Sequence, residues 1–337
     1  MKRVKRLFAC LLALTMMLGL SATAFAEQAE TKPTDQTTVK IKKVYKLVGK
    51  GTSPAETFTL EQVGDGRVTD GDATVVVPPL KAITGAEFKE GAATGNGAIG
   101  EITVTLPAYN KVGVYEYTLK ETPGKTAGVE YYEGNITLVV TVVNAEEKGK
   151  FHVESVAVHK GDASSVKSDT FENTYSAGTL NVSKTVTGNL GDKDKYFEFK
   201  VTLIGDNKKS YGESYAVTGG SNTSNPKTIE IGKETTFFLK DDERISIANL
   251  PYGVTYAVTE TPEEGYKTKV NKTEGNTVTG QEINKSEQNV AFENNKNKES
   301  GEIDTGVYLD NLPYILVFAG VLAIAVVFAV RRRRFED

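Results

Sequence analysis

The stretch Tyr117-Thr118-Leu119-Lys120-Glu121-Thr122-Pro123 returns later in the chain as Tyr256-Ala257-Val258-Thr259-Glu260-Thr261-Pro262. In both copies apolar and polar residues alternate before the proline, which is the period-two pattern of a half-buried strand. Two further blocks recur in the same order around it: an apolar-x-apolar-x-Lys block at 39–43 and 180–184, and Phe-Glu-Asn at 171–173 and 292–294. An ordered repeat of this kind predicts two domains of one type.

The segments between these blocks also read as strands. β-Branched and aromatic residues alternate with polar ones at 38–42, 102–106, 136–143 and 197–203, and Gly, Asn, Asp and Pro separate such runs at short intervals. No part of the chain between its two ends carries a helical stripe. We therefore expect an all-β chain of two tandem antiparallel sandwiches, at 37–176 and 177–297, after a polar leader at 27–36.

The N-terminus has the three parts of a secretory signal. Four basic residues lie within the first six positions, an apolar run follows from Leu7 to Leu20, and Ala24-Phe25-Ala26 has the small-x-small pattern of a cleavage site. Residues 1–26 are therefore predicted to be a signal peptide. Cleavage would remove Cys10, the single cysteine, so the exported chain would have no disulfide to stabilise it.

The C-terminus predicts a membrane anchor. An apolar run from Leu312 to Val330 is long enough to cross a bilayer, and the four arginines at 331–334 would stay on the cytoplasmic side. Just before this run stands Glu302-Ile303-Asp304-Thr305-Gly306. We assign 298–306 to a stalk with this motif and 307–337 to the anchor and basic tail; an ordinary tail anchor is the alternative.

The charge balance argues against nucleic acid as a partner. The whole chain holds 40 basic and 44 acidic residues, for a net charge of −4. Removal of both ends takes eight basic and three acidic residues, which leaves 32 and 41 and a net charge of −9. An acidic surface without a basic patch is not typical of proteins that bind nucleic acid or anionic lipid.

Each repeat places three polar residues on the apolar face of their strands, because side chains two apart share a face. These residues are Lys43, Glu121 and Asn173 in the first copy, and Lys184, Glu260 and Asn294 in the second. Burial lowers the pKa of a lysine and raises that of a glutamate. A neutral lysine amine could then attack an asparagine carboxamide and release ammonia, while the glutamate moves the protons, to leave an isopeptide bond.

The simpler interpretation is that each lysine reaches water from a strand end, each Glu-Thr-Pro is an exposed turn and each asparagine caps a loop. The register also leaves alternatives open. Lys42 or Lys40 could replace Lys43, although Lys42 falls on the other face and Lys40 lies earlier in the strand. Asn295 could replace Asn294, although it would point outward.

The ordered blocks resemble the isopeptide-forming, CnaB-like Ig-like domains of Gram-positive pilins, and the whole chain is similar to the two-domain major pilins of the T-antigen type. The resemblance implies a Lys43–Asn173 bond formed with Glu121 and a Lys184–Asn294 bond formed with Glu260. Residues 302–306 resemble a sortase sorting signal, with Asp304 where proline is usual, which implies cleavage after Thr305.

The same resemblance implies a structural role without a cofactor: a pilus backbone subunit that makes only its own single-turnover cross-links and is not otherwise an enzyme. It would be exported through a membrane-bound precursor to the cell wall or pilus. Its partners would be sortase, identical pilin subunits, minor pilins and peptidoglycan. The lysine that accepts Thr305 of another subunit would be Lys167, with Lys160 as the second choice.

Two other functions are weighed against this one. The first is a monomeric wall-anchored adhesin or stalk. Against it, no separate N-terminal binding domain is left over once two sandwiches are assigned. The second is a secreted β-sandwich hydrolase or carbohydrate-binding module, which the missing tryptophan and the lack of a paired-carboxylate motif disfavour.

No metal site is expected. His152 and His159 are too isolated and are assigned to surface strand positions. Asp65, Asp70 and Asp72 lack the spacing of a calcium-binding loop and are assigned to a hairpin loop.

Overall fold

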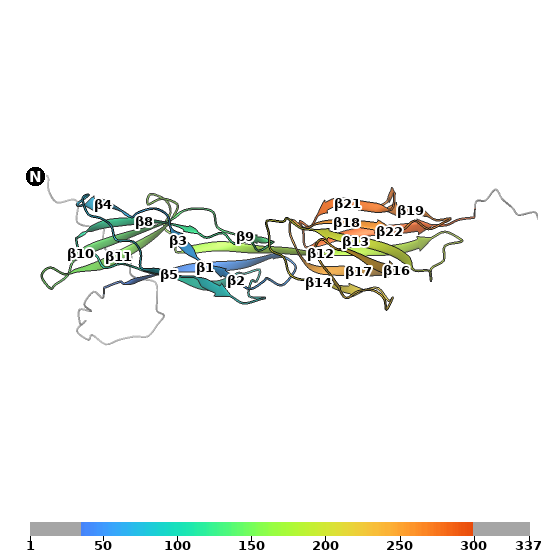
Figure 1. Cartoon of the computed structure of the whole chain (residues 1–337), viewed down its shortest axis with the longest axis horizontal. Coiled ribbons are helices and arrows are strands. Elements are labelled where there is room, and N and C mark those ends of the chain that lie inside the picture. Colours follow the sequence, from blue (N-terminus) through green and yellow to red (C-terminus); the bar gives the residue numbers. More distant parts are fainter. Residues whose placement is uncertain (1–34, 299–337) are drawn as a thin grey trace, which may run out of the picture. The chain divides into compact units, whose positions relative to one another are not determined.

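Strands make up all the regular structure of the described residues. The structure is a computed structural model that describes residues 35–298, and every regular element in that range is a β-strand (Figure 1). The prediction of an all-β chain is confirmed. The predicted signal peptide, most of the leader, the motif at 302–306 and the membrane anchor lie outside this range. Within 35–298, no helix has the length and apolar character needed to cross a bilayer.

The largest sheet contains strands from both repeats. Its main path runs in the order β15-β14-β17-β12-β1-β7-β5, and four further strands attach to this path or to one another. Its members are β1 (Thr38–Gly49), β5 (Ala82–Thr84), β7 (Ala98–Thr105), β9 (Val129–Glu130), β12 (Thr170–Thr187), β14 (Tyr215–Gly219), β15 (Thr228–Ile229), β17 (Glu243–Pro251), β19 (Lys267–Val270), β20 (Thr273–Glu274) and β22 (Glu287–Asn295).

Three smaller sheets complete the two sandwiches. In the first repeat, one sheet holds β3 (Leu60–Gln62), β4 (Arg67–Gly71), β8 (Gly113–Glu121), β10 (Ile136–Asn144) and β11 (Phe151–Lys160), and a short pair holds β2 (Glu56–Phe58) and β6 (Ala86–Phe88). In the second repeat, the partner sheet holds β13 (Phe197–Ile204), β16 (Glu234–Leu239), β18 (Thr255–Glu260) and β21 (Thr277–Glu282).

The long strand β12 belongs to both repeats. It carries the Phe-Glu-Asn block of the first and the Lys block of the second, and it is drawn in yellow-green in Figure 1. Its first part pairs in parallel with β1, and its second part pairs in parallel with β22. The expected boundary at 176/177 therefore falls within one continuous strand. A glycine is required just after it, because a Cβ atom on Gly178 would lie 2.3 Å from the carbonyl oxygen of Lys285.

Alternation along β1 shows how the sequence decides which side chains enter the core. Val39, Ile41 and Tyr45 are buried, whereas Lys40 and Lys42 are exposed. Because successive side chains of a strand point to opposite faces, this pattern fixes one face of β1 against the opposing sheet. Lys43 lies on the same buried face as the apolar residues.

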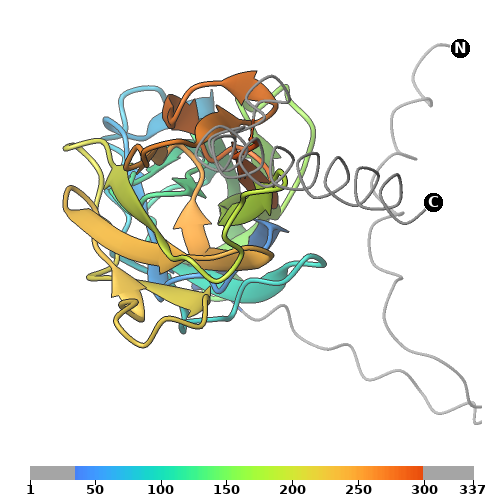
Figure 2. The ribbon, with the colours of Figure 1, turned by 90° about the vertical axis from the view of Figure 1, so that its right-hand side faces the viewer.

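Two separate hydrophobic cores result. The first is built from buried residues between Val39 and Ala177, and the second from buried residues between Leu180 and Phe292. Tyr45 and Phe58 meet edge to face in the first core with ring centroids 5.1 Å apart, and Phe199 and Phe292 do so at the same distance in the second. Figure 2 turns the strands of the second core, yellow to red, toward the viewer.

The packing of β10 gives a first prediction. Leu138 is fully buried and Val139 is only partly buried. We expect Leu138→Ala to lower the free energy of unfolding of the first repeat by about 2–5 kcal/mol, because the substitution leaves a cavity. Val139→Ala on the same strand is the matched control and should cost clearly less. Urea unfolding followed by tyrosine fluorescence measures both, and equal losses would contradict this account of the core.

Candidate functional site

The first candidate site is a cluster of three polar side chains inside the first core: Lys43 on β1, Glu121 at the end of β8 and Asn173 on β12. The Lys43 residue is 0% exposed, and its Nζ atom donates a hydrogen bond to Oδ1 of Asn173 at 2.7 Å. Nζ also donates to Oε2 of Glu121, and Nδ2 of Asn173 donates to Oε1 of the same carboxylate. The amine is thus held directly against the carboxamide.

Strand register explains how side chains so far apart in the sequence meet. In the parallel pair of β1 and β12, Lys43 lies opposite Phe171 and Tyr45 lies opposite Asn173. Lys43 and Asn173 therefore enter the core from neighbouring strands of one sheet. Glu121 reaches them from β8, which belongs to the opposing sheet of this core.

The second candidate site repeats this arrangement in the second core. Lys184 lies on β12 opposite Phe292 of β22, and Asn294 is two residues further along β22. Glu260, the last residue of β18, comes from the four-stranded sheet. The Nζ atom of Lys184 donates to both carboxylate oxygens of Glu260 at 2.9 Å, and Nδ2 of Asn294 donates to Oε1.

The two sites differ at the asparagine oxygen. Oδ1 of Asn173 accepts a second hydrogen bond, from the backbone N–H of Tyr132 at 3.0 Å. Oδ1 of Asn294 is buried and has no hydrogen-bond partner in the described part of the chain. The sequence repeat did not predict a role for Tyr132, because the donor is a backbone N–H and does not depend on the residue type.

Aromatic rings lie beside both amines. Nζ of Lys184 lies 4.2 Å from the ring centroid of Phe197, and Nζ of Lys43 lies 5.2 Å from that of Phe58. Their place beside the amines was not predicted from the sequence, although Phe197 and Phe199 alternate on a predicted strand. Apolar rings at this distance exclude water from the amines.

Burial moves the ionisable groups toward their neutral forms. Desolvation lowers the pKa of Lys43 and lowers the pKa of Lys184 from 10.5 to about 8, even though Glu260 beside Lys184 acts in the opposite direction. Desolvation also raises the pKa of Glu260, against the opposing effect of Lys184. A neutral amine is a nucleophile, so the lowered lysine pKa suits both sites to attack on the carboxamide, and at the second site a protonated Glu260 would be a proton donor.

The residues weighed as alternatives lie elsewhere. Lys42 is exposed and its Nζ atom is 3.7 Å from Asp169, and Nζ of Lys40 is 3.0 Å from Glu101. Asn295 donates to Oγ1 of Thr187 at 2.9 Å instead of entering the core cluster. The structure therefore brings Lys43 and Asn294 to the two clusters and leaves these three residues outside them.

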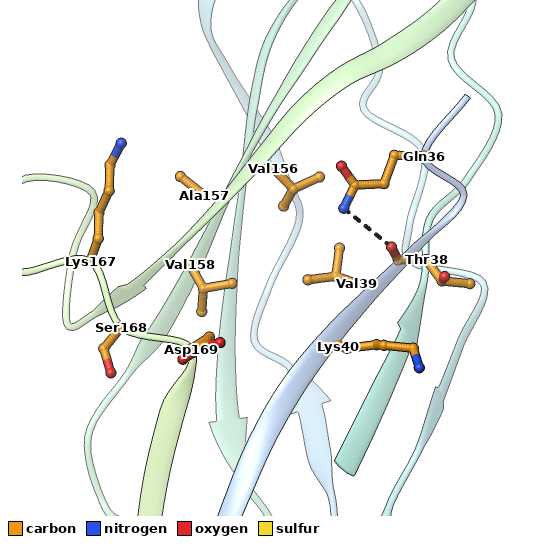
Figure 3. Close-up of a pocket in the computed structure, with 10 residues that line it drawn as sticks. All are labelled: Gln36, Thr38, Val39, Lys40, Val156, Ala157, Val158, Lys167, Ser168 and Asp169. Carbon is orange, nitrogen blue, oxygen red and sulfur yellow. Dashed lines mark hydrogen bonds between the residues drawn. The ribbon is translucent and has the colours of Figure 1, made fainter. Parts of the chain in front are cut away.

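Lys167, the predicted intersubunit lysine, borders an open groove of about 560 Å³ (Figure 3). The start of β1 forms one side of this groove, and β11 with residues 167–169 forms the other. The lysine is exposed, and its ammonium points away from Asp169 in Figure 3. Its amine makes no ion pair or hydrogen bond within residues 35–298.

The turn before Lys167 is held by β11. Lys167 forms a backbone bridge with His159, and the N–H of Ser168 donates to the carbonyl of Val158 at 3.0 Å. The assignment of His159 to the surface was wrong: the residue is buried, and Nδ1 of its ring lies 2.9 Å from the carbonyl oxygen of Ser165. This hydrogen bond fixes the turn that presents Lys167. Lys160, the second choice, has its Nζ atom 5.4 Å from the ring centroid of Tyr132.

The acidic segment near Asp65 is not a plain hairpin loop, because Asp70 lies in β4. The carboxylate of Asp72 accepts a hydrogen bond from Nζ of Lys111 at 2.6 Å. Across residues 35–298, no three His, Cys, Asp or Glu side chains are grouped to hold a metal ion. The motif residues Glu302, Ile303, Asp304, Thr305 and Gly306 lie outside the described range.

Two family models match the two repeats separately. Residues 39–176 match the Spy0128-like isopeptide containing domain, and residues 178–296 match a domain of unknown function (DUF7601). A curated protein named "Pilin" from Streptococcus pyogenes serotype M1 is 30% identical over 258 residues, which cover 73% of this chain and 74% of that protein. A segment of the pilus tip adhesin Cpa from S. pyogenes is 39% identical over 118 residues, or 35% of this chain and 16% of the adhesin.

Solved structures show the same fold. The crystal structure of the major pilin from S. pyogenes is 24% identical, covers 79% of this chain and 100% of its own, and superposes with a TM-score of 0.51. A point mutant of that pilin gives a TM-score of 0.53 at 24% identity, over 78% of this chain and 99% of its own. At this level of identity the agreement supports the arrangement of strands.

The buried lysine of the second site gives a prediction on pH. In an Asn294→Ala variant the amine cannot react, and we expect Lys184 to keep the pKa of about 8 that burial gives it, whereas in the unfolded chain the pKa returns to 10.5. Between these values the unfolded state binds more protons, so stability should rise with pH, by about 2 kcal/mol from pH 8 to pH 9.5.

Urea titrations of the second repeat at several pH values measure this rise. The matched control is the double variant Asn294→Ala with Lys184→Met, which lacks the titrating amine and should not show it. The same pH dependence in both variants would contradict the buried-lysine account.

Proposed function

The chain belongs to the major pilins of Gram-positive bacteria and is a pilus backbone subunit, and we propose that each of its two modules, 37–176 and 177–297, closes an internal isopeptide bond. The bonds are Lys43 to Asn173 and Lys184 to Asn294. One observation carries this proposal: both cores bury a lysine, a glutamate and an asparagine in the same strand register, with the amine and the carboxamide sharing one carboxylate.

The proposed reaction needs only these side chains. The neutral lysine amine attacks Cγ of the asparagine, and a carbon–nitrogen bond forms as the carbonyl electron pair moves to Oδ1. The glutamate accepts a proton from the attacking nitrogen and gives one to Nδ2, so that ammonia leaves and the carbonyl re-forms. Glu121 and Glu260 act once each. The protein is structural and does not turn over a substrate.

Each bond would join the first strand of a module to its last. The first closes a loop between residues 130 positions apart, and the chain-entropy model of a cross-link gives about 5 kcal/mol of stabilisation for a loop of this size. Without Cys10, the exported chain has no cysteine that could do the same. The isopeptide bonds would take the place of disulfides in a protein that works outside the cell.

Assembly into the pilus is proposed to join Thr305, which lies beyond the described region, to a lysine of another subunit. Sortase would cleave after Thr305 and release Gly306 with the predicted membrane anchor. The acyl group of Thr305 would then pass to the amine of Lys167 on the next subunit, or to peptidoglycan at the base. The amine of Lys167 is exposed beside an open groove and has no ion pair within residues 35–298, which supports this choice over Lys160, whose Nζ lies over the ring of Tyr132.

The internal bonds are tested by mass. We expect residues 27–305, expressed alone, to weigh two ammonia masses less than the sequence requires, because each bond expels one ammonia. Glu121→Ala and Glu260→Ala should each restore one of them, while Glu116→Ala, a buried glutamate outside both clusters, should restore none. Intact-mass spectrometry of the folded proteins measures this, and an unmodified mass in folded wild-type material would refute the cross-links.

The intersubunit lysine is tested in the cell wall. We expect wild-type cells to yield a ladder of covalent multimers on a denaturing gel and Lys167→Ala cells to lose it. Lys160→Ala should keep the ladder, because its amine is not the acceptor. A single wall-linked species in wild-type cells would favour a monomeric stalk or adhesin instead, and a ladder that survives Lys167→Ala would exclude Lys167.

A further inference from the structure

The two candidate sites provide different numbers of hydrogen bonds to the oxygen of the asparagine carboxamide. Oδ1 of Asn173 accepts from Nζ of Lys43 at 2.7 Å and from the backbone N–H of Tyr132 at 3.0 Å. A backbone N–H can only donate, so the atom that faces Tyr132 is the carbonyl oxygen and not the amide nitrogen. Oδ1 of Asn294 is also buried, yet no residue of 35–298 donates to it.

The path of the chain explains this difference. In the first module β9 pairs with β12 only as far as Glu130, opposite Thr174, and two residues later the chain turns its N–H to the Asn173 side chain. In the second module the corresponding strand β19 stays paired with β22 over Lys267–Val270, with Thr268 opposite Asn294. This segment remains in the backbone ladder, and Asn294 receives no donor from it.

Packing holds the Tyr132 donor in place. The ring of Tyr132 meets the ring of Phe171 with centroids 5.1 Å apart and planes at 63°, and Phe171 lies two residues before Asn173 on the same buried face. Nζ of Lys160 lies 5.4 Å from the same tyrosine ring. The donor is therefore fixed before any reaction begins, which is the requirement for a preorganised site.

We propose that the backbone N–H of Tyr132 is the oxyanion donor of the first cross-link, and that the second cross-link forms more slowly because its site has none. This inference rests on the proposed function. When Nζ of Lys43 bonds to Cγ of Asn173, the carbonyl electron pair moves to Oδ1, where the N–H stabilises the negative charge. Glu121 carries the proton from the attacking nitrogen to Nδ2, and the electron pair returns as ammonia leaves.

The expected size of the effect follows from other preorganised donors. Loss of one such donor from a water-excluded site slows acyl chemistry by about 10²–10³-fold. Both sites hold the same three side chains in the same register, although Nζ of Lys43 also donates to Oδ1 of Asn173, whereas Nζ of Lys184 donates to the two oxygens of Glu260. The first bond should therefore form at least about 10²-fold faster than the second.

The unaltered protein provides the first test. The full-length chain is made in a short cell-free pulse, and samples taken at intervals are digested so that mass spectrometry measures the cross-linked peptide of each site. Times are counted from the point at which each module becomes resistant to a brief protease pulse, which removes differences in folding. The first bond should appear well before the second.

Three variants locate the effect at the N–H. Tyr132→Pro removes the donor and should slow formation of the first bond about 10²-fold, to a rate near that of the second bond. The rate of the second bond should not change and serves as the internal reference. Tyr132→Ala removes the ring but keeps the N–H and should slow it much less. Glu133→Pro places the same proline ring at the next, exposed residue and leaves the Tyr132 donor in place.

The outcomes separate this inference from the proposed function. If no cross-linked peptide forms at either site, the proposed function fails. If both form but at equal rates after folding, or if Tyr132→Ala slows the first bond as much as Tyr132→Pro, the oxyanion role is overturned and the isopeptide bonds stand. If Tyr132→Pro does not become protease-resistant, the rates of the two bonds in the unaltered chain still test the oxyanion role.

Discussion

Parallel pairing of the first and last strands of each module is the constraint on which both sites depend. A slip of one residue in either pair would turn its strand's lysine or asparagine out of the core. A slip of two would keep both inside but shift one relative to the other by about 6–7 Å along the strand and change their native offset of two residues. Parallel neighbours require a long crossover connection, and here the rest of the sandwich is that connection. The fold as a whole therefore sets the distance between amine and carboxamide.

The cost of burying charge links this geometry to reactivity. A lysine and a glutamate in an apolar core lose their hydration, and their mutual attraction repays only part of it. Burial lowers the pKa of Lys184 and raises that of Glu260, which favours the neutral pair, and the neutral amine is the nucleophilic form. Formation of an amide then removes the basic nitrogen altogether. Burial of the lysine and the glutamate thus destabilises the folded state before the isopeptide bond forms and favours the folded state that contains the bond.

Alternation and repetition were enough to predict the six cluster residues, because each block marks its own inward face. The continuity of β12 was not foreseen: Ser176 to Gly178 contains small residues that resemble a turn, and only pairing on both sides extends them into one strand. The burial of His159 depends on the turn folded over it, and the Tyr132 donor depends on where β9 ends. Such features arise from tertiary contacts and not from residue type.

The continuity of β12 also decides how a fibre of these subunits would carry load. With Lys167 as the acceptor, tension would enter just before β12, follow its backbone to Lys184, cross the second bond to Asn294 and leave at Thr305. The first bond would lie beside this path and not on it. Its mechanical role would be to keep β1 attached when β12 is pulled, since Lys43 and Asn173 join these two strands directly. The two chemically similar bonds would then have different mechanical roles, because only the second would bear the full tension.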